Sequence, residues 1–394
     1  MSEYESDLSQ LVYELNRLAP AKKANSSSRA DAEIAKKISP DPYLDTLLAQ
    51  AAERNASDVL LIAGAGITLR ISGVLTPSTG RALSAEDLRT LLLPLLNAEQ
   101  VRELDSRRVI DFCFARATLG RFRANIHYQR GTLAASIRLL PAQIPTLESL
   151  NLPPILARLV ERRQGLILIT GPTGSGKTST MAALVHLINT RRREHIITIE
   201  DPVEYQHVNR NSIIEQIEVG TDTPGFSHAV RAVLRQSPDV ILIGEMRDPE
   251  TMGAALTAAE TGHLVLSSLH TNDTAQTMSR LLDSFPAGNQ TQIRQQMSLA
   301  LLAVIAQQLV PAAGLPGRFP ALEIMVATNG IRNLIRTAQD HQIRSQISTG
   351  SADGMTTMDQ SLAELVRSRR ILRETAMAHC HHPEELRSML NRSL

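Results

Sequence analysis

The hydrophobic pattern divides this chain into two folded regions. Between residues 41 and 140, short strand-like segments mix with helical ones. Between residues 154 and 370, near-continuous Val, Ile and Leu runs are separated by helical stretches, which predicts a mainly parallel sheet buried on both faces. These apolar runs are residues 165–170, 196–199, 240–243 and 264–269.

The first region is expected to be a small α+β domain. Its expected elements are a helix with Leu44, Leu47, Leu48 and Ala51 on one face and Asp41 as its cap, a hairpin of residues 59–62 and 67–72, a helix capped by Ser84 and Asp87 that Pro94 kinks or ends, and strands over 109–114, 121–128 and 132–140.

Arginines lie on one face of the last two of these strands. Because side chains alternate between the faces of a strand, Arg121 and Arg123 lie opposite Phe122, and Arg138 lies opposite Ile137. One interpretation is an ordinary solvated face. The other, which the phosphate loop described next favours, is a set of arginines directed across a cleft at a nucleotide.

A glycine-rich loop follows the apolar run of residues 165–170. It reads Gly171, Pro172, Thr173, Gly174, Ser175, Gly176, Lys177, Thr178, and a helix is expected from Ser179 onward. A strand, such a loop and a helix in this order are the context of a phosphate-binding loop. Glycines let backbone N–H groups close around a polyphosphate; we expect Lys177 to reach the outer phosphates and Thr178 to ligate Mg²⁺. The alternative is a glycine-rich turn without a ligand.

Acidic residues follow two of the other strands, at the sheet edge where a nucleotide is expected. Glu204 belongs to a cluster after residues 196–199. Glu245 comes after residues 240–243, where Gly244 replaces the aspartate that many phosphate-loop enzymes use for Mg²⁺. We therefore expect Glu245 to orient the attacking water and Glu204 to place water or metal. Helix capping or ion pairing is the alternative for each.

Two histidines bracket the strand expected over residues 264–269. A neutral imidazole at His263 or His270 can donate a hydrogen bond to a phosphate oxygen and so respond to the terminal phosphate. A purely structural role is the alternative for both.

Composition narrows the class of protein. The net charge of the 394 residues is +1 and only 3% are aromatic, which argues against nucleic-acid binding. No apolar run reaches the roughly 18 residues of a membrane span, and the start of the chain does not resemble a signal peptide. With two distant cysteines and no disulfide framework, we expect a soluble cytoplasmic protein that reaches a membrane through partners.

Taken together, these motifs carry a family resemblance. The loop 171–178, the acidic segment 199–205, residues 242–248, residues 260–263 and residues 269–271 resemble, in order and spacing, the type II/IV secretion ATPase superfamily. Residues 329–336 (NGIRNLIR) are similar to the C-terminal motif of the type IV pilus retraction ATPases, the PilT family, with Gly330 and Thr337 departing at its ends.

The resemblance implies a RecA-like α/β ATPase core at residues 154–370 and a PAS-like N-terminal domain at residues 41–140. An extension with a flexible linker (1–40), an interdomain linker (141–153) and a C-terminal helical tail (371–394) complete the expected domains. The extension has helical apolar spacing at residues 4–18, which fits either a disordered tail or a docking helix.

The same resemblance implies the function. We expect a homohexameric, Mg²⁺-dependent ATPase that drives pilus retraction through an inner-membrane platform protein, together with the pilus machinery and a paralogous retraction ATPase. By position, Lys177, Thr178 and Ser179 continue the nucleotide loop, and Glu204 and Glu245 are the acidic-box and second-strand glutamates. His263 and His270 match the histidine box, and Arg123 and Arg138, with Arg121 nearby, match N-domain arginines that approach the phosphates.

Other functions stay open from the sequence. A pilus extension or type II secretion ATPase fits the same motifs, although the chain lacks the tetracysteine zinc module of many such enzymes. A structural ring with little hydrolysis and a RecA-like enzyme acting on DNA are the alternatives of other classes. Residues 379–382 (HCHH) invite a metal interpretation, but their spacing favours a polar helix end before Pro383.

Overall fold

A computed structural model describes residues 42–391 except 72, 79 and 315–316. The chain forms two compact units that meet in sequence between Leu140 and Pro141. The predicted N-terminal helix and the capping role of Asp41 lie outside the described residues. Among the described residues, none of the helices has both the length and the apolar composition that a bilayer crossing requires.

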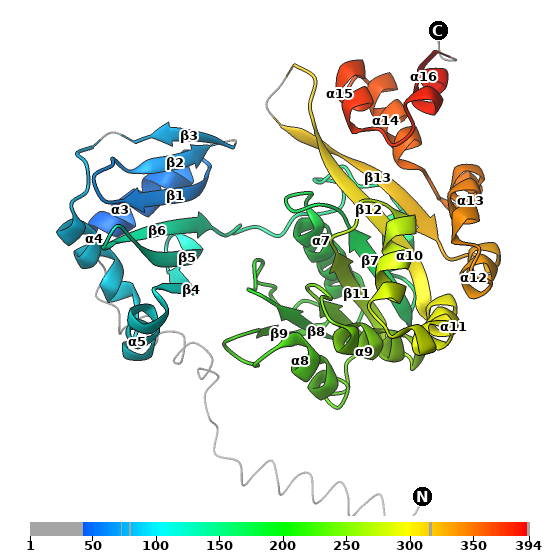
Figure 1. Cartoon of the computed structure of the whole chain (residues 1–394), viewed down its shortest axis with the longest axis horizontal. Helices are drawn as coiled ribbons and strands as arrows, with labels where there is room; N and C mark the ends of the chain where they lie inside the picture. Colours follow the sequence, from blue (N-terminus) through cyan, green and yellow to red (C-terminus); the bar gives the residue numbers. More distant parts are fainter. Residues whose placement is uncertain (1–41, 72, 79, 315–316, 392–394) are drawn as a thin grey trace, which may run out of the picture. The chain divides into compact units, whose positions relative to one another are not determined.

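The smaller unit contains a twisted antiparallel sheet with helices packed on it (Figure 1). The described strands follow the order β3-β2-β1-β6-β5-β4. The elements are α3 (Pro42–Glu53), β1 (Ala56–Ile62), β2 (Thr68–Ile71), β3 (Val74–Pro77), α4 (Ala85–Leu92), a 3₁₀ turn (Leu93–Leu95), α5 (Ala98–Arg107), β4 (Val109–Arg116), β5 (Gly120–Gln129) and β6 (Thr132–Leu139).

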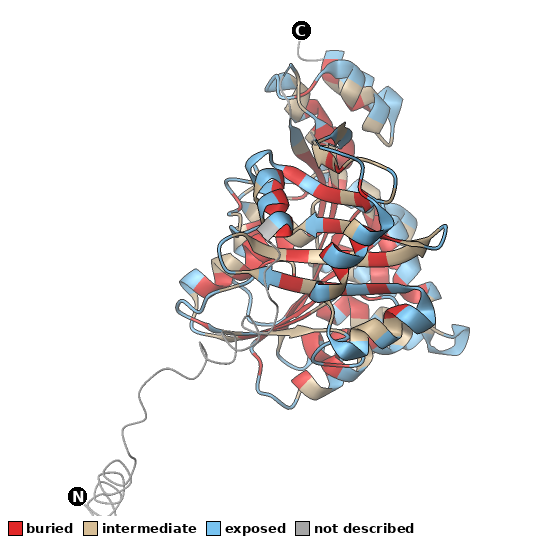
Figure 2. Ribbon diagram, turned by 90° about the vertical axis from the view of Figure 1, so that its left-hand side faces the viewer, coloured by how far each residue is buried: buried red, intermediate tan, exposed pale blue. Residues whose placement is uncertain are grey.

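Local sequence explains these elements. The predicted capping box is present, since Ser84 Oγ accepts from the Asp87 N–H and the Asp87 carboxylate accepts from the Ser84 N–H. Helix α4 ends at Leu92, just before Pro94. Buried and exposed residues alternate along the strands of this sheet, as the colouring of Figure 2 shows. Phe122 is buried while Arg121 and Arg123 lie on the other face, as the alternation predicts.

The larger unit is built on a mainly parallel sheet in the order β13-β12-β7-β11-β10-β8-β9, in which only the β12–β13 pair is antiparallel among the described strands. The elements up to the last strand are α6 (Ile155–Leu159), β7 (Gly165–Thr170), α7 (Lys177–Arg191), β8 (His195–Glu200), β9 (Ile213–Glu218), α8 (Phe226–Val233), β10 (Val240–Ile243), α9 (Pro249–Glu260), β11 (Leu264–Leu269), α10 (Thr274–Asp283), a 3₁₀ turn (Ala287–Asn289), α11 (Gln290–Ala300), β12 (Leu301–Pro311) and β13 (Arg318–Val326).

The four apolar runs form the centre of this sheet. Every residue of β7, β10 and β11 is buried, because helices cover both faces of the sheet. Leu147 and Leu152, from the expected interdomain linker, are also buried and join the core of this unit. Parallel strands of this kind direct their carboxyl ends, and the loops that follow them, to one edge.

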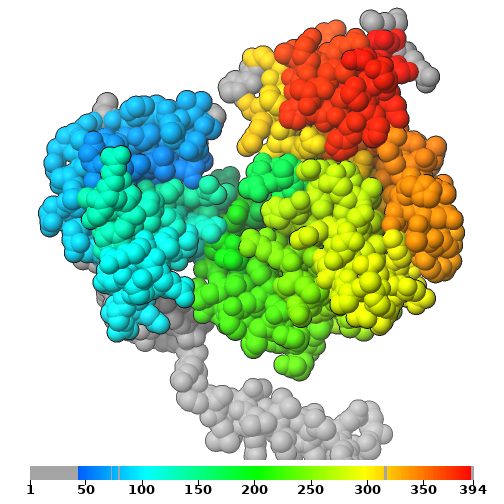
Figure 3. Space-filling model, viewed as in Figure 1, coloured from blue at the N-terminus to red at the C-terminus, as the bar shows by residue number. Residues whose placement is uncertain are grey.

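Helices follow the last strand. They are α12 (Asn329–Arg336), a 3₁₀ turn (Asp340–Gln342), α13 (Ile343–Thr349), a 3₁₀ turn (Ser351–Asp353), α14 (Met358–Arg367), α15 (Arg373–His379) and α16 (Pro383–Asn391). The last three form the red lobe of Figure 3 beside β12 and β13 and share with those strands a core that contains Leu362 and Leu386. The α/β class, the N-terminal α+β unit and the C-terminal helices are therefore confirmed.

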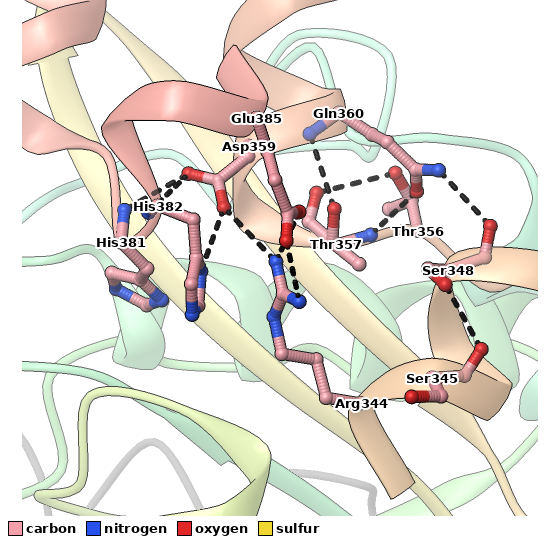
Figure 4. A network of polar contacts seen from close by, with 10 residues as sticks. All are labelled: Arg344, Ser345, Ser348, Thr356, Thr357, Asp359, Gln360, His381, His382 and Glu385. Atoms are coloured by element: carbon pink, nitrogen blue, oxygen red, sulfur yellow. Dashed lines mark hydrogen bonds and ion pairs between the residues drawn. The ribbon is translucent and has the colours of Figure 1, made fainter. Parts of the chain in front are cut away.

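A buried carboxylate ties these helices together (Figure 4). Asp359 of α14 is 1% exposed and accepts hydrogen bonds from the backbone N–H groups of His381 and His382. The His382 ring lies 3.1 Å from the same carboxylate, and Arg344 of α13 pairs with both Asp359 and Glu385 of α16. Residues 379–382 thus connect α15 to α16.

Candidate functional site

The glycine-rich loop leaves the carboxyl end of β7, the strand between β12 and β11, and ends where α7 begins. Gly171, Gly174 and Gly176 have φ angles of 143°, 79° and 87°, a region that favours glycine. Gly176 is the N-cap of α7, so the loop passes directly into the positive end of the helix dipole. The expected strand, loop and helix are present in the expected order.

Lys177 turns back onto this loop. Its Nζ donates to the carbonyl oxygens of Gly171 and Pro172 at 2.8 and 3.1 Å, and the residue is 8% exposed. Burial lowers the pKa of the Lys177 ammonium, and the nearby Glu245 carboxylate opposes that shift. The Ser175 hydroxyl is buried with no hydrogen-bond partner among the described residues. Phosphate oxygens would accept from both groups, so the loop fits a polyphosphate ligand.

Glu245 follows β10 and meets one of the two expected histidines. Its carboxylate pairs with Arg247 at 2.7 Å and lies 3.3 Å from His270 Nε2, and its side chain is 15% exposed. The Met246 N–H donates to the Ser268 carbonyl of β11, which fixes the turn after β10 against the neighbouring strand. The parallel sheet thereby brings a carboxylate, an imidazole and the loop lysine to one edge.

The acidic segment after β8 lies against the start of α7. The Tyr205 hydroxyl is 2.8 Å from the Ser179 hydroxyl, next to the phosphate loop. Burial, and to a smaller extent the half-buried Glu204, raises the pKa of Tyr205. Burial also raises the pKa of Glu200, which accepts from Thr198 at 2.6 Å. Glu204 thus belongs to a partly buried acidic cluster near the loop.

His263 lies at the other end of β11 from His270. The Gly165 N–H donates to its backbone carbonyl, and its ring Nδ1 lies 3.0 Å from the Ala258 carbonyl. The six residues of β11 separate it from the edge that carries Glu245. The larger unit therefore does not bring His263 to its own phosphate loop, and its part in the site stays a prediction.

The predicted arginines lie together on the sheet of the smaller unit. Arg123 of β5 is directly opposite Arg138 of β6, and Arg121 is two residues away on the same face. Arg138 donates to the buried Asp58 carboxylate at 2.9 Å, whereas the Arg123 side chain has no hydrogen-bond or ion-pair partner among the described residues. Like charges placed opposite each other destabilise a sheet, so an anion at this face would relieve a cost.

Two glutamines, the buried Gln307 and the partly buried Gln216, support the site, and neither belongs to a motif in the sequence. Gln307 of β12 bonds to the Ser175 carbonyl and to the Thr180 hydroxyl at 2.7 and 2.8 Å. Gln216 of β9 bonds to Glu200, to the Tyr205 carbonyl and to the His207 N–H, and so holds the acidic segment. No sequence signal identifies either, since their partners lie far away in the chain or in irregular structure.

The comparisons with known proteins agree with this geometry. The family model described as type II/IV secretion system protein matches residues 134–377, more than half of the chain. The chain belongs to this family. The predicted resemblance and the predicted ATPase activity of the secretion type are confirmed.

Relatives named for twitching motility and pilus retraction match over most of their length. The chain is 42% identical to a twitching motility protein of Neisseria gonorrhoeae, over 81% of this chain and 85% of that protein. It is 41% identical to the type IV pilus retraction ATPase PilT of Pseudomonas aeruginosa, over 86% and 98%. A crystal structure of the pilus retraction motor PilT with bound ADP superposes with a TM-score of 0.80, at 43% identity over 87% and 98% of the two chains.

Proposed function

We propose that this chain hydrolyses ATP in the presence of Mg²⁺ as the motor of type IV pilus retraction. The observation that carries the proposal is the edge of the larger sheet, where the phosphate loop, Lys177, Glu245 and His270 converge. Similarity to known proteins supports the same proposal, because the chain matches pilus retraction ATPases over nearly their full length, and one of them is described with bound ADP.

ATP would occupy the loop from Gly171 to Ser179, including Pro172 and Thr173, with its phosphates on the N–H groups of the loop. Lys177 would exchange its bonds to the loop carbonyls for bonds to phosphate oxygens. Thr178, and Glu204 through a water, would hold Mg²⁺, which supplies neutralisation of charge on the transferring phosphoryl group. The fit rests on the unpartnered Ser175 hydroxyl and on the glycine conformations.

Glu245 would orient the attacking water and accept its proton. Arg247 and His270 contact its carboxylate from two sides. These two contacts would fix the carboxylate orientation and thereby the position of the water that it binds. His270 would donate to the terminal phosphate, and His263 would act with it as the second member of the histidine box. Arg123 and Arg138, with Arg121, would stabilise the transition state on a nucleotide of their own or a neighbouring subunit.

The assembly belongs to the same proposal. Residues 41–140 would be the PAS-like domain and residues 154–370 the RecA-like domain of a homohexameric ring, joined by residues 141–153. The ring would act at the cytoplasmic side of the inner membrane through the pilus platform protein and would pair with a paralogous retraction ATPase. Residues 1–40 and 371–394 would flank the motor.

One experiment tests the chemistry and a second tests the direction. The purified chain should release phosphate from ATP only with Mg²⁺ present, and Lys177→Ala should abolish that release; full turnover by the variant would contradict the proposal. Deletion of the gene should leave cells with excess pili that no longer twitch. Loss of pili would instead favour the extension or secretion motor.

A further inference from the structure

Gln307 lies directly behind the phosphate loop. It belongs to β12, next to β7, and is 3% exposed. Its Nε2 donates to the Ser175 carbonyl at 2.7 Å, and its Oε1 accepts from the Thr180 hydroxyl at 2.8 Å. One side chain therefore connects the loop, the first turn of α7 and the neighbouring strand.

The Ser175 carbonyl fixes which way the glutamine amide faces. A carbonyl oxygen can only accept, so the NH₂ group of Gln307 must face Ser175. That leaves the amide oxygen to accept from the Thr180 hydroxyl. In a trans peptide the C=O and the N–H point in opposite directions, so anchoring the Ser175 carbonyl directs the N–H of Gly176 away from Gln307. This is the side on which we propose that phosphate binds.

The loop also packs tightly against this residue. A Cβ on Gly171 would lie 2.2 Å from the Gln307 carbonyl oxygen, and a Cβ on Gly176 would lie 2.8 Å from Gln307 Nε2. Gly171 is thus required by contact with the Gln307 backbone as well as by its φ angle, and a side chain at Gly176 would displace the Gln307 amide. Gln308, the next residue, faces the other way, toward His379 and His381.

We propose that Gln307 is a positioning residue for nucleotide binding. Its side chain orients the Gly176 N–H toward phosphate, and Thr180 holds that side chain in the required rotamer. The inference rests on the proposed nucleotide site. Gln307 belongs to none of the sequence motifs, yet it would align one of the backbone amides that bind the phosphate.

The test measures ADP affinity, the KM for ATP, kcat and the melting temperature of the nucleotide-free full chain. We expect Gln307→Leu to weaken ADP binding and raise the KM about tenfold, or about 1.4 kcal/mol. Thr180→Val should weaken binding about threefold, Thr180→Ser should restore it, and the Gln307→Leu/Thr180→Val double variant should be no worse than Gln307→Leu alone. Gln308→Leu, the matched control, should bind ADP as the wild type does.

Each outcome decides the matter. Wild-type affinity in Gln307→Leu, or an equal loss in Gln308→Leu, would overturn the inference. A lowered melting temperature with unchanged ADP affinity would assign Gln307 a structural role only and would also overturn it. If Gln307→Leu does not fold, equal affinities of Thr180→Val and Thr180→Ser overturn it. If the wild-type protein itself did not bind ADP, that result would instead contradict the proposed function, on which this inference rests.

Discussion

At the scale of single residues, the proposed chemistry depends most on Glu245. Replacing it with Gln keeps the size and the bond to Arg247 but removes the proton acceptor. We expect kcat to fall by about 10²–10⁴ while ADP affinity changes less than about threefold, since general-base catalysis contributes that much. Phosphate release and ADP titration measure the two effects, and Glu161→Gln, an exposed site, is the control. Equal losses of kcat and affinity would assign Glu245 to binding.

The lowered pKa of His207 leads to a prediction for how the stability of the protein depends on pH. Burial, and secondarily the neighbouring His186, lower the pKa of His207 to about 4. Above pH 6.5 the imidazole is neutral in both the folded and the unfolded chain, so its contribution is complete there. As the pH falls from 6.5 to 4, only the unfolded chain takes up the proton, and the free energy of unfolding falls by up to roughly 3 kcal/mol. Thermal melts of His207→Leu should show a flatter dependence over this window, whereas His341→Leu should not.

The sequence predicts those site residues that follow a strand directly. Lys177, Glu245 and His270 are each found from local order, because a parallel sheet gathers the ends of its strands at one edge. Gln307 cannot be found in this way, because its two hydrogen-bond partners are 127 and 132 residues away in the chain. Only the register between β12 and β7 brings it behind the loop. His263 shows the opposite situation. It is close to His270 in sequence, but β11 lies between the two, so His263 is at the far end of the strand from the site.

At the scale of elements, α12 has a structural part in the retraction-type motif. Arg332 donates to the carbonyl oxygens of Ser298 and Leu299 at 2.6 Å and of Ala327 at 3.0 Å, and so caps the end of α11. A cation at the carboxyl end of a helix also interacts favourably with its dipole. Arg336 instead lies exposed and bonds only within its own helix, to Asn333, among the described residues.

We therefore expect Arg332→Met to destabilise the protein by about 2 kcal/mol, because three backbone carbonyls, two of them in partly buried bonds, lose a charged donor. For a domain of roughly 250 residues this lowers the melting temperature by about 4–8 °C. Arg336→Ala should change the free energy of unfolding by less than about 0.5 kcal/mol. Thermal unfolding of both variants makes the measurement, and equal melting temperatures would argue against the capping role.

The hydrophobic pattern predicts most elements and misses three strands of the larger sheet. The missed strands are β9, β12 and β13. Strand β12 follows α11 without an intervening turn residue, so one apolar stretch passes from helix to strand and its period does not mark the boundary. Strand β9 is an edge strand with an uneven burial pattern, and such strands lack the continuous apolar run of the buried ones.

At the scale of the whole molecule, two units with separate cores share the proposed work. The cluster around Phe122 and Leu44 belongs to the smaller unit, and the clusters around the parallel sheet belong to the larger one. The phosphate loop and the unpartnered Arg123 therefore belong to bodies that fold around different cores. Hydrolysis that depends on both would couple chemistry to relative movement.

Arg123→Ala tests that dependence. We expect kcat to fall on the order of 10³-fold, the effect of removing an arginine that stabilises phosphoryl transfer, with ADP affinity changed only a few-fold. Arg102→Ala, an exposed arginine of α5, is the matched control. Unchanged turnover in Arg123→Ala would restrict the catalytic machinery to the larger unit.

The Asp359 network has a consequence for shortened forms of the chain. A stop codon just after residue 380 would remove the backbone donors of His381 and His382 to Asp359, the Glu385 partner of Arg344, and the buried Leu386 and Leu390. Losing hydrogen bonds to a charged group together with two buried leucines costs several kcal/mol, which is comparable to the whole stability of a domain. Frameshifts near this terminus should therefore behave as null alleles, through degradation of the product, even though every nucleotide-site residue is still encoded.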